Sequence, residues 1–236
     1  MSEDLGTRTR LLIGEEGVEK LRNSSAIVCG CGAVGGYAIE GLVRAGVGRI
    51  GVIDGDEFSP SNLNRQVLAT VDTIGRRKAE VAVERARSIN PDIDAEAMVT
   101  FVGEDTIPDI LEGDWDVLVD CIDTIGRKAE MLRAANRRGM RIFSSMGAAM
   151  HLDATAIRID TLRKTSVCPM AARLRKELRD EDTSGITCVY SVENCGIKPQ
   201  DRDEHGKSVL GSMPTIPAIF GMTLANETVK YLLGRD

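Results

Sequence analysis

Residues 26–36 read AIVCGCGAVGG, and this stretch decides the fold. An apolar run meets a glycine-rich turn, and an apolar, helix-like segment follows it. Gly30, Gly32 and Gly35 have the G-x-G-x-x-G spacing, which provides a tight turn, a close approach of backbone to phosphate, and close packing of helix on strand. The spacing alone also fits a glycine-rich turn in any strand–helix unit. The stretch therefore predicts strand, turn and helix, with an anion site at the start of the helix.

The segment after this turn favours a nucleotide site. The next apolar run ends at Asp54, roughly 20 residues further on, where an acid would hold a ribose hydroxyl. Asn64, Arg65 and Gln66 then follow, and Lys78 lies in the next predicted helix. Arg and Lys around a glycine turn suit a triphosphate, because they neutralise negative charge that develops on a reacting phosphoryl group.

Length and composition fit one large α/β domain. The chain of 236 residues can bury a full core but is too short for two such domains and a linker. We therefore predict one domain over 1–236, with a nucleotide-binding half (1–147) and a substrate and dimer half (148–236). No apolar run approaches the roughly 20 residues that span a bilayer, so we expect a soluble cytoplasmic protein without a membrane partner.

Hydrophobic periodicity extends the α/β pattern along the chain. We predict strands at 26–29, 49–54, 95–99, 115–121, 141–147, 155–160 and 186–191, and helices at 15–22, 37–45, 75–89, 106–111, 124–138, 163–179 and 214–233. The predicted fold class is α/β, a Rossmann-like, mostly parallel sheet with flanking helices and an antiparallel C-terminal extension.

Carboxylates end the strand predicted at 115–121. At the carboxyl end of a parallel strand they face the ligand crevice, where one of them could hold Mg²⁺ through oxygen. Asp120 is explained somewhat better as a cap on the following helix, so Asp123 is the preferred Mg²⁺ ligand.

The six cysteines do not indicate a zinc site, because none forms a C-x-x-C pair. Three lie at predicted strand ends and are explained as core thiols. The roles of the other three stay open: Cys168, Cys188 and Cys195.

Positive charge gathers in the segment 163–179, although the net charge of the chain is −6. Apolar residues at four-residue spacing predict a basic amphipathic helix there. Such a helix usually presents a solvated face, and contact with nucleic acid is the alternative. Four of its cations follow Pro169: Arg173, Arg175, Lys176 and Arg179.

With these motifs, the whole chain resembles the superfamily of ThiF, MoeB and the ubiquitin-activating enzymes. The motifs that carry the resemblance are RTRLLIG (8–14), the glycine turn (30–36), DGD (54–56), SNLNRQ (61–66), Lys78, INP (89–91) and DCID (120–123). Within the superfamily, KTSVCP (164–169) is similar to a segment of the tRNA threonylcarbamoyladenosine dehydratases, which agrees with the absence of zinc cysteine pairs.

The resemblance implies a binding site for ATP and Mg²⁺ and a homodimer as the active unit. The implied ATP site consists of Gly30, Gly32, Gly35, Asp54, Asp56, Asn64, Arg65, Gln66 and Lys78. Asp123 would position Mg²⁺. Arg8 would reach into the partner subunit's site, and Arg10 is the fallback for that role.

The implied reaction is adenylation of a carboxylate. In the dehydratases this carboxylate belongs to the threonylcarbamoyl group on tRNA, and the group's own carbamoyl then closes a ring, so no protein nucleophile is required. The sequence departs from the family at Ala149 and Met150, where Gly-Asn is more usual, and at Ala154, where proline is expected.

Two alternatives stay open. One is adenylation of the C-terminal glycine of a ubiquitin-like sulfur carrier, which would bring a sulfur-transfer partner. The other is a non-catalytic nucleotide-binding protein or an NAD-dependent oxidoreductase, against which Arg65 and Lys78 argue.

Overall fold

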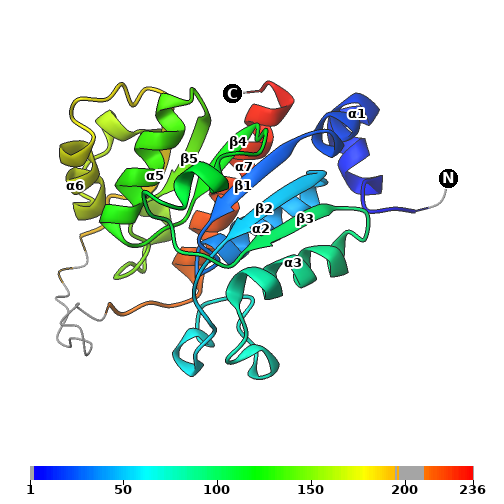
Figure 1. The fold of residues 1–236 in the computed structure, drawn as a ribbon, viewed down its shortest axis with the longest axis horizontal. Helices are drawn as coiled ribbons and strands as arrows, with labels where there is room; N and C mark the ends of the chain where they lie inside the picture. Colours follow the sequence, from blue (N-terminus) through cyan, green and yellow to red (C-terminus); the bar gives the residue numbers. More distant parts are fainter. Residues whose placement is uncertain (1–2, 195, 197–209, 236) are drawn as a thin grey trace.

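The protein is built on one seven-stranded sheet with helices on both faces (Figure 1). The structure is a computed structural model that describes residues 3–194, 196 and 210–235. The strand order is β3-β2-β1-β4-β5-β7-β6. The strands are β1 (Ser25–Cys29), β2 (Arg49–Ile53), β3 (Asp94–Met98), β4 (Val117–Asp120), β5 (Arg141–Ser145), β6 (Ile157–Thr161) and β7 (Ile186–Ser191).

The pairing of the strands confirms the predicted fold class. Every neighbouring pair from β3 to β7 is parallel, and only β6 runs antiparallel, along β7 at the edge. The sequence order reverses between β1 and β4, as in doubly wound sheets. The helices are α1 (Thr7–Arg22), α2 (Gly35–Ala45), α3 (Lys78–Ile89), α4 (Ile107–Ile110), α5 (Ile125–Arg137), α6 (Pro169–Glu177) and α7 (Thr215–Leu233).

Each face of the sheet has its own apolar core. One core joins α2, α3 and α7 to the sheet, and the other joins α4, α5 and α6 to the opposite face. The helices α2 and α7 pack closely because small residues meet: a Cβ added to Gly41 would lie 2.7 Å from Cβ of Ala225. None of the described helices has the length and apolar character needed to cross a membrane.

Three predicted helices differ in length from those observed by three residues or more. The helix predicted at 75–89 begins only at Lys78, because Gly75 adopts a left-handed φ of +79° after a short 3₁₀ turn at Val71–Thr73. The first helix is longer than predicted, and Gly14 interrupts it with φ +78° and ψ 174°.

The basic helix predicted at 163–179 is reduced to α6. Its first residue is Pro169, whose ring favours the first position of a helix and disfavours helical geometry in the residue before it. Leu162–Lys164 form a separate 3₁₀ turn.

Candidate active site

The candidate site lies where the strand order reverses, outside the carboxyl ends of β1 and β4. Open α/β sheets bind ligands at this point, because the crossovers on its two sides lead to opposite faces. The glycine turn follows β1, Asp54 follows β2, and Asp123 lies three residues after the end of β4. Three adjacent strands therefore bring predicted residues to one edge of the sheet.

The glycines of the turn meet different requirements. Gly30 has φ +94°, and a Cβ there would lie 2.9 Å from the carbonyl oxygen of Cys121. A Cβ at Gly35 would lie 1.8 Å from the carbonyl oxygen of Gly30. At Gly32 the nearest atom would be Nε2 of Gln66, 3.9 Å away, so protein packing does not require glycine at this position. The open backbone at Gly32 fits the close approach of a phosphate.

Asp54 fastens the end of β2 to the glycine turn. Its carboxylate accepts hydrogen bonds from the backbone N–H groups of Cys31, at 2.7 Å, and Asp56, at 2.8 Å. Burial raises the pKa of Asp54, and these two donors and the Lys78 ammonium offset the rise only in part. Each oxygen keeps a further lone pair for a hydroxyl donor, which fits the predicted contact with ribose.

Lys78 is a nearly buried cation, with 7% of its surface exposed. Its Nζ lies 3.2 Å from Oδ2 of Asp56, and its backbone N–H donates to the carbonyl of the same residue. As the first residue of α3 it opposes the helix dipole, so its position is unfavourable for stability alone. A buried cation at the start of a helix costs stability, and such local costs are expected at functional sites.

The loop with Asn64, Arg65 and Gln66 lies beside the glycine turn. One Arg65 nitrogen, Nη1, donates to the carbonyl of Ser61 and to Oδ1 of Asn64, at 2.7 and 2.9 Å. Asn64 in turn donates to the carbonyl of Ser212, 3.0 Å away. Oε1 of Gln66 is buried without a hydrogen-bond partner among the described residues, so it can accept a bond from a ligand.

Asp123 and Asp120 have separate environments. Asp123 is exposed and accepts a hydrogen bond from Oγ1 of Thr124 at 3.1 Å. Asp120 is fully buried and forms an ion pair with Lys128, so its interpretation as a helix cap is wrong. The carboxylate of Asp120 accepts hydrogen bonds from Ser144 and from the N–H of Ile122, and no described side chain caps the first turn of α5.

A magnesium ion fits Asp123 when phosphates complete the site. The described residues contain no cluster of three His, Cys, Asp or Glu side chains that could hold a metal by itself. Mg²⁺ is usually bound through one or two carboxylates together with substrate phosphates, and it keeps several waters. One exposed carboxylate at the ligand edge meets that requirement.

Arg8 lies apart from the other predicted residues. It is on α1, which leads into the start of β1 and lies near the amino ends of the strands (Figure 1), whereas the glycine turn follows the carboxyl end of β1. Arg8 is exposed and has no side-chain partner in the described part of the chain. Arg10 is occupied, since its guanidinium binds Asp4 at 3.2 Å and Glu15 at 2.6 Å.

The sequence profile of the ThiF family matches residues 7–236. This chain belongs to the ThiF family. It is 34% identical to the tRNA threonylcarbamoyladenosine dehydratase of Bacillus subtilis (strain 168), over 96% of this chain and 94% of that protein. It is 40% identical to a sulfur carrier protein adenylyltransferase of Thermus thermophilus, over 94% of this chain and 74% of that protein.

A solved structure of the same family has the same fold. The crystal structure of the E. coli dehydratase TcdA in complex with ATP superposes with a TM-score of 0.86 at 29% identity, over 97% of this chain and 93% of that chain. ATP is bound in that crystal structure.

The described cysteines of this ThiF-family chain are buried in the core, except that Cys121 is only partly buried. Burial raises the pKa of Cys29, Cys31 and Cys121, and it raises the pKa of Cys188 to about 12. Such thiols stay protonated near neutral pH and are poor nucleophiles. Cys168 is buried as well, and Cys195 lies outside the described residues.

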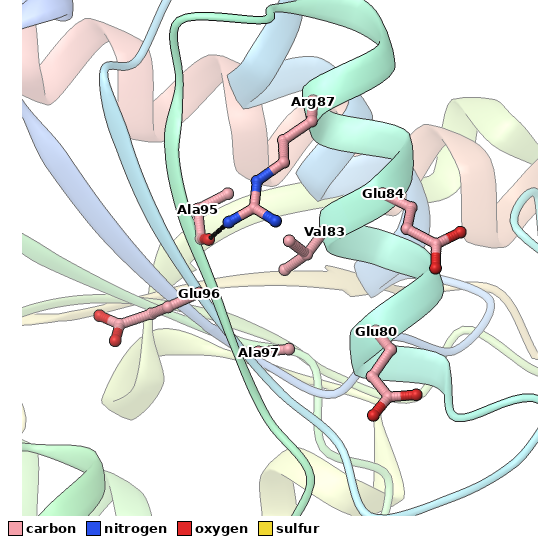
Figure 2. A pocket seen from close by; sticks show the side chains of 7 residues that line it. All are labelled: Glu80, Val83, Glu84, Arg87, Ala95, Glu96 and Ala97. Atoms are coloured by element: carbon pink, nitrogen blue, oxygen red, sulfur yellow. Dashed lines mark hydrogen bonds between the residues drawn. The ribbon is translucent and has the colours of Figure 1, made fainter.

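A hollow between α3 and β3 is separate from the candidate site (Figure 2). Its lining includes Glu80, Glu84 and Arg87, and Arg87 donates a hydrogen bond to the carbonyl of Ala95 at 2.7 Å. None of the predicted site residues lines this hollow.

Proposed function

We propose that this chain is an ATP-dependent tRNA threonylcarbamoyladenosine dehydratase. The observation that carries the proposal is that three features meet at one edge of the sheet: an open glycine turn, a carboxylate bound to that turn and a buried ammonium. The match to dehydratases over nearly the whole chain supports the same substrate.

In the proposed reaction, a carboxylate oxygen of the threonylcarbamoyl group attacks the α-phosphorus of ATP. The bond to the leaving phosphate breaks, pyrophosphate departs, and an acyl-adenylate remains. The carbamoyl group then attacks the acyl carbon, the bond to AMP breaks, and one proton is lost. The modified nucleoside has lost one water in total.

The residues of this chain position and stabilise charge in these steps. The backbone of Gly30, Gly32 and Gly35 would hold the phosphates, and Asp54 would bind the ribose. Lys78 and Arg65 would neutralise the charge that builds on the α-phosphate, which is the main electrostatic contribution in phosphoryl chemistry. Asn64, Gln66 and Asp56 would orient these groups.

Asp123 would hold Mg²⁺, which supplies Lewis-acid stabilisation of phosphate charge when bound. The exposed carboxylate at the ligand edge supports this assignment. Its neighbour Asp120 is fully buried in an ion pair with Lys128, whereas Asp123 is exposed.

The proposed active unit is a homodimer in which Arg8 completes the partner's site. Two observations support it: Arg8 lies at the amino-end edge of its own sheet, and the same helix exposes Leu11 and Leu12 with 80% and 81% of their surface. Adjacent exposed leucines on one helix are typical of an interface. We also propose a cytoplasmic location, where the tRNA substrate would be met.

The deciding experiment is mass analysis of nucleosides from threonylcarbamoyladenosine-containing tRNA after incubation with the protein and ATP. We expect conversion to the product lacking one water, with one AMP released for each nucleoside converted. The alternative, favoured by the Thermus relative, predicts no change in the tRNA and ATP–pyrophosphate exchange that requires a ubiquitin-like carrier with a C-terminal glycine. That outcome would also support the predicted sulfur-transfer partner.

A further inference from the structure

A buried ion pair lies directly beneath the candidate site. Asp120, at the end of β4, and Lys128, on α5, are both fully buried, and Oδ2 lies 2.6 Å from Nζ. Removing two charges from water is costly, so such a pair is weak evidence for a purely stabilising role. The pair therefore requires a further explanation.

The two backbone contacts of the pair are both with Ile122. Lys128 donates from Nζ to the carbonyl of Ile122 at 3.0 Å, and the N–H of Ile122 donates to Oδ1 of Asp120 at 3.1 Å. Ser144 of β5 donates to Oδ2 of Asp120 at 2.6 Å and fixes that carboxylate. The ion pair thus satisfies both backbone groups of the residue immediately before Asp123.

The same loop also supports the glycine turn. The N–H of Cys121 donates to the carbonyl of Cys29 at 2.8 Å. The Cys121 carbonyl oxygen occupies the space that a Cβ on Gly30 would need. A shift of residues 121–123 would therefore displace the backbone of Gly30 as well as the carboxylate of Asp123.

We propose that Lys128 is a positioning residue that, together with Asp120, holds residues 121–123 so that Asp123 and Gly30 face Mg²⁺ and ATP. Its full burial keeps Lys128 away from reacting groups, so it acts only through the loop. This inference rests on the proposed function, in which Asp123 binds the metal.

The test compares ATP affinity at a series of Mg²⁺ concentrations by titration calorimetry. Lys128→Met leaves Asp120 charged and buried, so that variant can fail to fold. The double variant Asp120→Asn/Lys128→Met removes both charges and keeps an acceptor for the Ile122 N–H. The matched control is Glu40→Gln, which removes another buried carboxylate, paired with Arg44 and Arg85 away from the site.

We expect the half-saturating Mg²⁺ concentration to rise at least tenfold in the double variant, because residues that orient metal ligands typically contribute about 10- to 100-fold to metal affinity. Glu40→Gln should keep the wild-type value. A smaller rise in a folded double variant would overturn the inference. Wild-type protein without Mg²⁺-dependent ATP binding would instead contradict the proposed metal role of Asp123.

Hydrogen exchange on the wild-type protein tests the same inference without any substitution. If the ion pair fixes the loop beforehand, the Ile122 amide exchanges slowly in the absence of nucleotide. Fast exchange that becomes slow only after Mg²⁺ and ATP are added would overturn the inference.

Discussion

At the scale of single residues, Lys78 is the most informative member of the site. Lys78→Met keeps the length of the side chain and removes the charge beside Asp56. We expect the rate of AMP release with tRNA and ATP to fall about 100-fold or more, the usual cost of losing one electrostatic contact to the transition state. The thermal unfolding midpoint should change little, because the stem still packs in the same space.

The control for Lys78 is its neighbour Arg76, whose ion pair with Glu84 is exposed. Arg76→Ala should keep the wild-type rate, since exposed pairs contribute about 0–1 kcal/mol to stability and this one lies outside the site. A near-wild-type rate of AMP release by Lys78→Met would contradict the proposed role of Lys78 in the reaction.

Spacing predicts some residues of this site and cannot predict others. Gly30 and Asp54 follow from a motif, because local chain geometry fixes where they lie. Asp120 and Lys128 do not, because their contact depends on how β4 and α5 pack. A lysine on a helix is usually solvated, and nothing in the sequence marks Lys128 as fully buried.

At the scale of elements, the contact between α2 and α7 sets the position of the helix that follows the glycine turn. A Cβ at Gly221 would lie 2.4 Å from the carbonyl oxygen of Val34 and 2.7 Å from Cβ of Tyr37. Gly221→Ala should therefore lower the free energy of unfolding by about 1–3 kcal/mol through overpacking. Urea denaturation measures the change.

Gly126 provides the opposite case on α5. A Cβ there would have no atom within 4 Å, so Gly126→Ala should raise the free energy of unfolding by about 0.5–1 kcal/mol, since alanine favours the helix. Equal effects from both substitutions would show that helix propensity, and not the α2–α7 contact, governs Gly221.

The positions of helices and strands were predictable where the hydrophobic pattern was long. They were not predictable where a glycine or proline sets the first residue of a helix. The strands and α7 lie close to their predicted places. Burial gives β1, β2 and β4 mostly apolar runs, which the sequence shows directly. The starts of α3 and α6 were wrong. Gly75 sets the start of α3 through its left-handed φ, and Pro169 sets the start of α6 because it has no N–H. The run of charged residues around each boundary did not indicate either effect.

At the scale of the whole molecule, a net charge of −6 requires that any attraction to tRNA be local. Two cations of α6, Arg173 and Lys176, are exposed. Arg175 is occupied, since its guanidinium donates to the carbonyl of Thr165. Arg173→Ala/Lys176→Ala should weaken tRNA binding and reduce the slope of log affinity against log salt by about two units.

A second double variant controls for net charge in the tRNA measurement. Arg22→Ala/Arg76→Ala removes two exposed cations from other surfaces, so it should keep the wild-type slope. ATP affinity should stay unchanged in both. Identical slopes for all three proteins would remove α6 from the tRNA site and indicate a solvated face.

The proposed homodimer makes the whole-molecule arrangement testable through subunit mixing. Arg8→Ala and Lys78→Ala should each be inactive alone. In a mixed dimer, the subunit carrying Arg8→Ala keeps its own Lys78 and receives Arg8 from its partner, so one of the two sites is complete. Equal mixing with free exchange should restore about a quarter of wild-type activity, because half of the dimers are mixed and each has one working site. If Arg8 served its own subunit, every site in the mixed dimer would lack one residue and no activity would return. Exchange is verified by native mass spectrometry of differently tagged subunits, so a lack of recovery despite mixed dimers would reject the proposed arrangement.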